Sequence, residues 1–518
     1  MSKPAGPIPV IDLFAGPGGL GEGFSSLVDA KGDRIFSVKV SIEKDAIAHK
    51  TLSLRALFRA FPSNAVPGCY YDYVRGDITR EQLFNHPDAK TAAHQASSEA
   101  RCAELGKTPH ATIDGWIEEA LGDNTEWVLI GGPPCQAYSL AGRARMRLKD
   151  TEAFEKDKRH FLYKEYLRII QKFQPSVFVM ENVKGMLNSQ HGGSPIFDRI
   201  MSDLKSPGGG RHYQVRSLVV DKDVLDPKDF IVQAENYGVP QRRHRVILIG
   251  IRSDHVDDVN ESTVAPIRLT LQKSKRNLSV CEALSGLPRL RSRLSKEHDS
   301  HEAWLAALKK GPLALKGWRV PNRILLEESM KSAAALASSY ASFGRRFEKM
   351  KVSMDDTVPP EFSEWILDPK LNGVLQHETR SHMRSDIHRY LFASCFAVMC
   401  SYSPKLKIYP PKLQPAHKNA VADHVPFTDR FRVQLAGEPS TTVVSHIAKD
   451  GHYYIHPDPA QCRSLTVREA ARLQTFPDNY FFEGNRTQQY AQIGNAVPPL
   501  LAMKIAKAIQ KFMTSRSK

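Results

Sequence analysis

The first 250 residues alternate short apolar runs with stretches of helical periodicity, and this alternation limits the fold more than any other feature. Several runs are continuous and rich in β-branched residues, as expected of strands that are covered on both faces. Strands separated by helices form βαβ units and a mostly parallel sheet. The predicted strands are 10–14, 36–42, 127–130, 177–180, 214–220 and 246–250. The predicted fold class is therefore α/β, with helices on both faces of the sheet.

The pattern changes after about residue 265, where the alternation fades and basic residues and prolines gather. A clear helix returns at 464–478, where Thr466 and Glu469 have the spacing of a capping box. The apolar run 391–402 is too short for a membrane span and is expected to be a buried helix. The predicted domains are a catalytic domain at 1–264 with an insertion at about 81–124, a second domain at 265–440, and a return to the catalytic domain at 441–518.

The formal net charge of +16 favours a polyanionic partner, and nucleic acid is the commonest one. The seven cysteines are scattered without a CxxC pair, which argues against a disulfide framework and against a cysteine-rich zinc site. The spacing of His377, His382 and His388 also lacks a convincing metal pattern, so no metal is expected. The N-terminus has no long apolar segment typical of a signal peptide, and we expect a cytoplasmic protein without membrane contact.

The segment PVIDLFAGPGGLGEGF combines a strand, a glycine-rich turn and the start of a helix. Gly16, Gly18 and Gly21 fit the G-x-G-x-x-G pattern, in which the backbone approaches a ligand at a helix N-terminus. Glu43 follows the next predicted strand, where an acid commonly binds ribose hydroxyls. Asp77 is expected to end a third strand, with a surface turn as the alternative. Alone, the pattern admits NAD, FAD, S-adenosylmethionine or no ligand.

Three further groups lie at predicted strand ends. Cys135 is on the proline-stiffened loop GGPPCQ, Glu181 closes a wholly apolar run, and Arg243 and Arg245 directly precede another. Each has an ordinary alternative: a small buried hydrophobe, a capping carboxylate and a solvated basic rim. Together they suit one chemistry, in which a thiolate adds to an electron-poor ring while an acid and an arginine hold that ring. Cytosine fits, because attack at C6 makes C5 nucleophilic enough to accept a methyl group, and nearby arginines can lower the pKa of the thiol.

The chain resembles the DNA (cytosine-5)-methyltransferases of bacterial restriction–modification systems. The matching segments occur in the order usual for that family, and they cover both ends of the chain and most of residues 1–250. They are DLFAGPGGLGEGF, Glu43 after the second strand, GDIT, GGPPCQAYS, ENV, QRRHR, RSLTVREAARLQTFPD and QIGNAVPPLLA. The glycine turn alone is a weak signal, but PCQ, ENV and GNAVPP are specific as a set.

The resemblance implies a Rossmann-like, S-adenosylmethionine-dependent sheet, a smaller irregular target-recognition domain, and a C-terminal helix that packs beside the first strand. It implies Cys135 as the nucleophile, Glu181 as the acid on cytosine, and Arg243 and Arg245 as residues that hold the base and order the catalytic loop. The implied cofactor residues are Phe14, Gly16, Gly18, Glu43 (ribose), Asp77 (adenine) and Asn495; those of the catalytic loop and base region are Gln136, Ser139 and Thr442.

The implied function is sequence-specific methylation of a flipped-out cytosine in double-stranded DNA, which protects that DNA from a cognate restriction endonuclease acting on the same site. A monomer associated with the nucleoid through DNA is expected, with Arg380, Arg384 and Arg389 as candidate DNA contacts or a solvated helix face. Three alternatives stay open. They are a tRNA cytosine-5 methyltransferase, whose Cys-Phe-Thr element is not visible here, a nicotinamide-dependent oxidoreductase, and a catalytically dead DNA-binding module.

Overall fold

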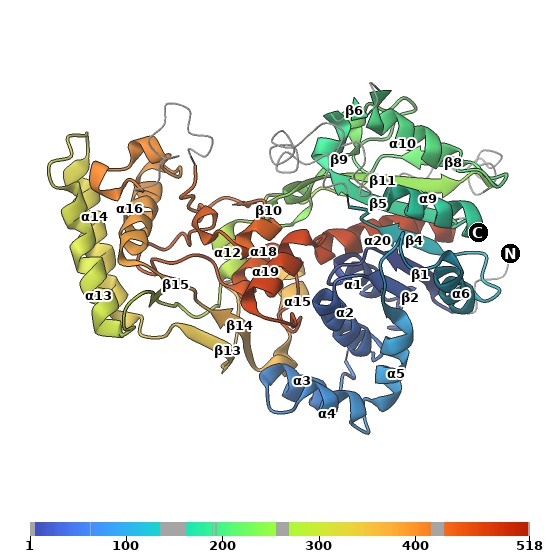
Figure 1. Ribbon diagram of the computed structural model, residues 1–518, viewed down its shortest axis with the longest axis horizontal. Coiled ribbons are helices and arrows are strands. Elements are labelled where there is room, and N and C mark those ends of the chain that lie inside the picture. Colours follow the sequence, from blue (N-terminus) through green and yellow to red (C-terminus); the bar gives the residue numbers. More distant parts are fainter. Residues whose placement is uncertain are drawn as a thin grey trace.

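The computed structural model describes residues 6–62, 64–134, 162–188, 190–191, 194–254, 269–415 and 429–515. The molecule has two lobes (Figure 1). One contains the large sheet and its covering helices, and the other is built from helices and short two-stranded ribbons. The C-terminal part of the chain runs between the lobes and ends on the sheet lobe.

The central sheet has the strand order β3-β2-β1-β4-β5-β11-β8, and β9 also pairs with β11. Strands β1 to β5 are parallel, whereas β11 is antiparallel to its neighbours β5, β8 and β9. The predicted α/β fold class is confirmed. The bounds are β1 Ile8–Leu13, β2 Phe36–Glu43, β3 Ala100–Cys102, β4 Val128–Gly131, β5 Val177–Val183, β8 Tyr213–Arg216, β9 Ile231–Gln233 and β11 His244–Arg252.

Helices cover both faces of this sheet because its strands are apolar on both sides. Val10 points into one core and the adjacent Ile11 into the other, as the alternation of a strand requires. The first core is covered by α1 (Gly19–Ser25) and α20 (Pro499–Ser515), and the second by α6 (His110–Leu121), α9 (Leu162–Phe173) and α10 (Ile196–Lys205). A Cβ at Gly23 of α1 would lie 2.5 Å from the Ala502 side chain of α20, so the two helices pack backbone to backbone.

The expected strand ending at Asp77 is wrong. The chain there forms α3 (Gly68–Arg75), because Cys69, Tyr70, Tyr73 and Val74 recur at helical spacing and bury one face of a helix. Gly76 ends that helix with a φ of 100°.

The segment expected as an insertion contributes strand β3 to the sheet edge and α6 to one of its faces. Helices α2 (Ala46–Arg59), α4 (Arg80–Asn85) and α5 (Lys90–Glu99) complete this region.

Residues 269–415 form the second lobe and the parts that join it to the sheet lobe. The run expected as a buried helix lies in α16, where Leu391 and Cys395 are buried, although Val398 and Met399 are exposed. The helices are α12 Val280–Leu284, α13 His301–Lys310, α14 Arg323–Leu336, α15 Pro360–Ile366 and α16 Arg384–Cys400. The strand pairs are β6 Gln190–His191 with β7 Ser194–Pro195, β10 Gln241–Arg242 with β16 Ser440–Thr441, β12 Arg293–Leu294 with β15 Ser381–His382, and β13 Gly344–Lys349 with β14 Gly373–Glu378.

The C-terminal region begins with α18 (Val467–Leu473), followed by α19 (Arg486–Asn495) and α20. The predicted capping box of Thr466 and Glu469 at the start of α18 is confirmed. Within the described ranges, none of the helices is both long and apolar enough to cross a membrane. The 3-10 helices are η3 Lys184–Asn188, η4 Pro227–Phe230, η5 Ala234–Tyr237, η6 Gly311–Leu315, η7 Ala337–Ser339, η8 Pro369–Leu371, η9 Leu406–Ile408, η10 Pro411–Leu413, η11 Ser445–Ala448 and η12 Gly451–Tyr453.

Candidate active site

The carboxyl ends of β1, β2, β4 and β5 lie at one edge of the sheet, because these strands are parallel. The strand order changes direction at β1, which has β2 on one side and β4 on the other. In open α/β sheets, ligands bind in the crevice outside such a switch point. The sequence-predicted residues at this edge fall into two neighbouring groups, one around the glycine turn and one around Glu181.

The glycine turn follows β1 directly. Phe14 has a φ of 58°, a left-handed conformation that is strained for a bulky side chain and often marks a functional site. Gly16 and Gly18 also have positive φ values, of 58° and 99°. A Cβ at Gly18 would lie 2.9 Å from Leu52 Cδ1 and 3.2 Å from the hydroxyl of Tyr480, so this position has no room for a side chain.

Glu43, at the end of β2, lies against this turn. Its carboxylate accepts hydrogen bonds from the backbone N–H of Gly16 at 2.8 Å and of Asp45 at 2.7 Å. The glycine turn and the acid predicted from sequence therefore lie together in space. A carboxylate beside a glycine-rich backbone suits a ligand with neighbouring hydroxyl groups.

The GNAVPP segment reaches the same turn from the C-terminal end of the chain. A Cβ at Gly19 would lie 2.3 Å from the carbonyl oxygen of Val497, so the two backbones are in contact. Asn495, two residues earlier, ends α19 and is exposed. The structure thus places the segment of Asn495 beside the glycine turn, although the two lie near opposite ends of the sequence.

Glu181 and Arg245 form an ion pair at the adjacent strand end. The Nε of Arg245 lies 2.9 Å from Oε1 of Glu181, and the side chains are 16% and 14% exposed, so the pair is partly exposed. A Cβ at Gly132 would lie 3.2 Å from Oε2 of Glu181, and Asn182 donates to the carbonyl of Pro133 at 3.4 Å. The acid therefore lies beside the segment 131–134, which leads covalently into position 135. Cys135, Gln136 and Ser139 themselves lie outside the described residues.

Arg243 lies apart from this pair, and its expected role in holding the base and ordering the catalytic loop stays a prediction. Its side chain is buried, and it donates to the carbonyls of Val443 at 3.0 Å and Gly494 at 3.3 Å. Burial, and then the charge of Arg245, lower the pKa of the Arg243 guanidinium to about 9. Arg243 thus holds two backbone segments together, whereas the guanidinium of Arg245 lies against Glu181.

Thr442 lies beside the QRRHR segment, as the resemblance implied for a residue near the base. Its hydroxyl donates to the carbonyl of Arg242 at 2.6 Å, and Gln241 accepts from the N–H of Val443 at 2.8 Å. The short parallel pair β10 and β16 fixes this approach. The sequence match was weak, but the two segments are neighbours.

Asp77 is exposed and lies beyond the end of α3, so it is not brought to the strand ends. Its N–H donates to the carbonyl of Asp72 at 2.8 Å. The acid that follows β3 is Glu104, which pairs with Lys107 at 2.8 Å and with Lys44, next to Glu43, at 3.6 Å. The hydrogen bond from Lys107 lowers the pKa of Glu104. The sequence signal for Glu104 was weak, because β3 has only three residues.

Asp12, one residue before the end of β1, is a second acid that was not predicted as a site residue from the sequence. It is fully buried, and a Cβ at Gly21 would lie 3.2 Å from its Oδ2. Burial raises the pKa of Asp12 to about 8, which the charge of Arg59 only partly opposes. The carboxyl is therefore neutral at pH 7, under the helix that follows the glycine turn. Its signal in the sequence was an acid inside an otherwise apolar strand.

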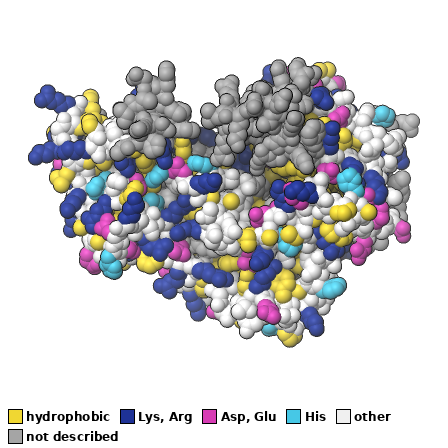
Figure 2. Space-filling model, in the orientation of Figure 1, with side chains coloured by type: hydrophobic (Ala, Val, Ile, Leu, Met, Phe, Trp, Pro, Cys, Tyr) yellow, Lys and Arg dark blue, Asp and Glu magenta, His cyan; other side chains and the backbone are white. Residues whose placement is uncertain are grey.

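The three arginines considered as DNA contacts all have partners within the protein. Arg384 forms a bidentate pair with Glu297, Arg389 bonds Asp386 and the Leu413 carbonyl, and Arg380 lies 4.2 Å above the ring of Tyr490. Other Lys and Arg side chains are spread over both lobes on the face shown in Figure 2. This surface fits a polyanion in general and singles out no DNA contact.

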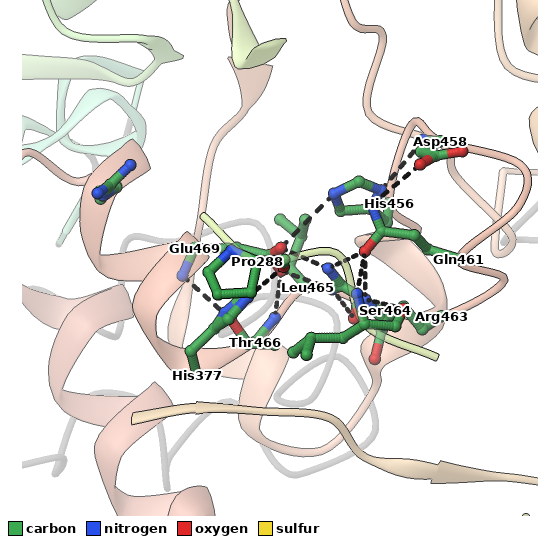
Figure 3. A network of polar contacts seen from close by, with 12 residues as sticks. Pro288, His377, His456, Asp458, Gln461, Arg463, Ser464, Leu465, Thr466 and Glu469 are labelled. Atoms are coloured by element: carbon green, nitrogen blue, oxygen red, sulfur yellow. Dashed lines mark hydrogen bonds and ion pairs between the residues drawn. The ribbon is translucent and has the colours of Figure 1, made fainter. Parts of the chain in front are cut away.

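A buried polar network joins the second lobe to α18 (Figure 3). His377 of β14 bonds the hydroxyl of Thr466 at 2.9 Å and the carbonyl of Pro288 at 2.8 Å. Arg463 forms a bidentate pair with Glu469 at 2.6 and 2.7 Å. The histidines weighed as metal ligands thus act as structural hydrogen-bonding groups. Burial lowers the pKa of His377 to about 4, and that of the neighbouring His382 to about 3.

Acidification should destabilise the protein through these histidines. The pKa of His377 is lower in the folded than in the unfolded state, so its contribution to stability is present above about pH 6.5 and is lost towards pH 4. We expect His377→Gln to flatten the fall of unfolding free energy over this window by up to about 1.4 kcal/mol per pH unit. Urea unfolding between pH 4.5 and 7 measures how the unfolding free energy depends on pH. The control is His94→Gln, because His94 is exposed on α5. A wild-type slope in His377→Gln would contradict the assignment.

Comparisons with known proteins point to one family. The family model for the C-5 cytosine-specific DNA methylase matches residues 107–511. The Type II methyltransferase M.Bpa9945I of Bacillus paralicheniformis is 31% identical, over 97% of this chain and 98% of its own length. The Type II methyltransferase M.DdeI of Desulfomicrobium norvegicum is 25% identical, over 97% and 88%. A crystal structure of a prophage-encoded DNA modification methyltransferase from E. coli superposes with a TM-score of 0.53 and 20% identity, over 98% and 99% of the two chains.

Proposed function

Because the chain belongs to the C-5 cytosine-specific DNA methylase family, we propose that it methylates C5 of a flipped-out cytosine in double-stranded DNA with S-adenosylmethionine as donor. The observation that carries this proposal is the partly exposed Glu181–Arg245 pair, which lies beside the segment leading into Cys135 and is separated from the strand of the glycine turn, β1, by β4. An oxidoreductase would leave this pair without a role.

The chemistry assigned to the pair follows from the base. Cytosine within a duplex cannot be reached by a thiol and a methyl donor together, so it must leave the stack, at a cost of a few kcal/mol. The Cys135 thiolate then bonds to C6 while Glu181 protonates N3 and Arg245 holds O2, which makes C5 an enamine-like nucleophile. After methyl transfer to C5, a water molecule takes the C5 proton, the C6–S bond breaks and frees the Cys135 thiolate, and N3 returns its proton to Glu181.

The cofactor fits the glycine turn and its surroundings. Gly16 has open space beside its backbone, Phe14 is held in a strained conformation at the turn, and Glu43 presents a carboxylate for the ribose hydroxyls. Asn495 would close the site from the C-terminal segment. Glu104, which follows β3, takes the adenine role that the resemblance had implied for Asp77. The bound sulfonium supplies the methyl group.

Glu43→Ala is expected to weaken binding of S-adenosylhomocysteine by roughly 10- to 100-fold, because charge-assisted hydrogen bonds to the ribose are lost. Asp77→Ala removes an exposed acid that follows α3 and not a strand of the central sheet, and it should leave the affinity unchanged. Isothermal titration calorimetry of both variants compares them directly. If Asp77→Ala bound S-adenosylhomocysteine more weakly than the wild type, and Glu43→Ala bound it as tightly as the wild type, the assignment of Glu43 to the cofactor would be wrong.

The activity itself is tested by incubating the protein with labelled methyl donor and duplex DNA, with tRNA in a parallel reaction. Labelled 5-methylcytosine in DNA is expected, whereas label only in tRNA would favour the second substrate.

Bisulfite sequencing of DNA from expressing cells would then identify the methylated sequence. The relatives named as Type II methyltransferases support a role in protecting that site from a cognate restriction endonuclease. Resistance of this DNA to an endonuclease of matching specificity tests the role.

A further inference from the structure

A buried chain of polar contacts connects the glycine turn's helix to the second lobe. Arg55 of α2 forms a bidentate pair with Glu22 of α1, at 2.6 and 2.9 Å. The same guanidinium donates to Oδ1 of Asn479 at 3.0 Å. Asn479 in turn donates from Nδ2 to Asp368 at 2.6 Å, and Tyr71 of α3 donates to the same carboxylate oxygen at 2.7 Å. Asn479 is therefore the link between a buried cation and a carboxylate.

One end of this series of contacts lies at the glycine turn, and the other lies at a segment that leads into the second lobe. At one end, Glu22 lies four residues beyond Gly18, and the hydroxyl of Tyr480, next to Asn479, donates to the carbonyl of Pro17 within the glycine turn. At the other end, Asp368 caps η8 by accepting from the N–H of Lys370 at 2.9 Å. That segment leads directly into β14, the ribbon that carries the histidine network.

The chemistry of the link requires an amide. Its oxygen faces a donor and its nitrogen faces an acceptor, so the two partners fix which way the amide points. An aspartate could not donate and would place a second carboxylate against Asp368. An aliphatic side chain would remove one partner from the buried Arg55 and one from the half-buried Asp368, which is costly.

We propose that Asn479 is a positioning residue that holds the second lobe, through Asp368, in register with the glycine turn, through Arg55 and Glu22. This inference rests on the proposed function, in which one lobe presents the cytosine and the turn presents the methyl donor. An error of about 1 Å in such a register can slow a reaction by about 100-fold, without removing any group that touches a ligand.

The test is single-turnover methylation by Asn479→Ala. We expect the rate constant to fall by roughly 10- to 100-fold, while the dissociation constants for S-adenosylhomocysteine and for duplex DNA stay within about threefold of wild type, since neither ligand is contacted. Asp368→Ala cuts the link from its other side and should give the same loss. Asp368→Asn keeps an oxygen for Asn479 and Tyr71, and it should restore most of the rate.

Asn485→Ala is the matched control, because it removes an exposed asparagine that caps α19 and lies outside the network. A merely structural role would reduce the amplitude of the single turnover, as the active fraction falls, and leave the rate constant unchanged. A normal rate constant in both Asn479→Ala and Asp368→Ala, or a failure of Asp368→Asn to recover the rate, overturns the inference. A wild-type protein without methyl transfer would instead contradict the proposed function. Should Asn479→Ala not fold, the two Asp368 variants decide.

Discussion

Cys135→Ala should lower methyl transfer by roughly 10⁴- to 10⁶-fold, the scale at which loss of a covalent nucleophile acts. Without addition at C6, C5 of cytosine is too weak a nucleophile to accept the methyl group. The last described residues before Cys135 lie beside Glu181, whereas the glycine turn and Glu43 form a separate group. Binding of S-adenosylhomocysteine should therefore be unchanged. Methyl incorporation into duplex DNA and calorimetry measure the two effects.

Cys400→Ala is the control for this substitution, since it removes an exposed thiol at the end of α16 in the second lobe. It should methylate at the wild-type rate. A second measurement uses DNA with 5-fluorocytosine at the target, because fluorine cannot leave C5 as a proton does. The wild-type protein should form a covalent adduct that survives denaturation, and Cys135→Ala should form none. Near-normal methylation by Cys135→Ala would remove the covalent mechanism.

Glu181→Gln should lower the rate of methyl transfer by roughly 10²- to 10⁴-fold, the usual range for a group that moves a proton in the transition state. Glutamine keeps the size and can still accept a hydrogen bond from Arg245, but it has no proton to give to N3 of cytosine. The loss should therefore fall on the rate constant of a single turnover, with DNA affinity much less affected. Rapid-quench measurement of that rate constant and a DNA titration separate the two.

Glu438→Gln provides a matched comparison, because Glu438 pairs at 2.5 Å with Arg242, which is three residues before Arg245. This pair is about half exposed and contributes about 0–1 kcal/mol at most. Its loss should leave the rate constant within about threefold of wild type. If Glu181→Gln behaved like Glu438→Gln, the acid at the base would have to be another residue.

The sheet and most of its strands could be predicted because their signals are local. Continuous β-branched runs such as 177–180 and 246–250 appear as β5 and β11, and the spacing of Thr466 and Glu469 gave the start of α18. The glycine turn and its acid Glu43 were also predictable, since their order along the chain implies adjacent parallel strands. The helix α3 was misread as a strand because its tyrosines satisfy either pattern over so short a stretch.

The sequence by itself determined the chemistry available to this protein: a thiol, an acid and arginines at strand ends, with a glycine turn for a cofactor. Only the tertiary structure decided which of the similar side chains reach the site. It buries Arg243 completely and leaves Arg245 partly exposed beside Glu181, and it places Glu104, not Asp77, after β3. It also joins Arg55, Asn479 and Asp368 across more than 400 residues of chain. Which side chain reaches the site depends on packing between segments far apart in the sequence. Residue type and local spacing do not reveal that packing.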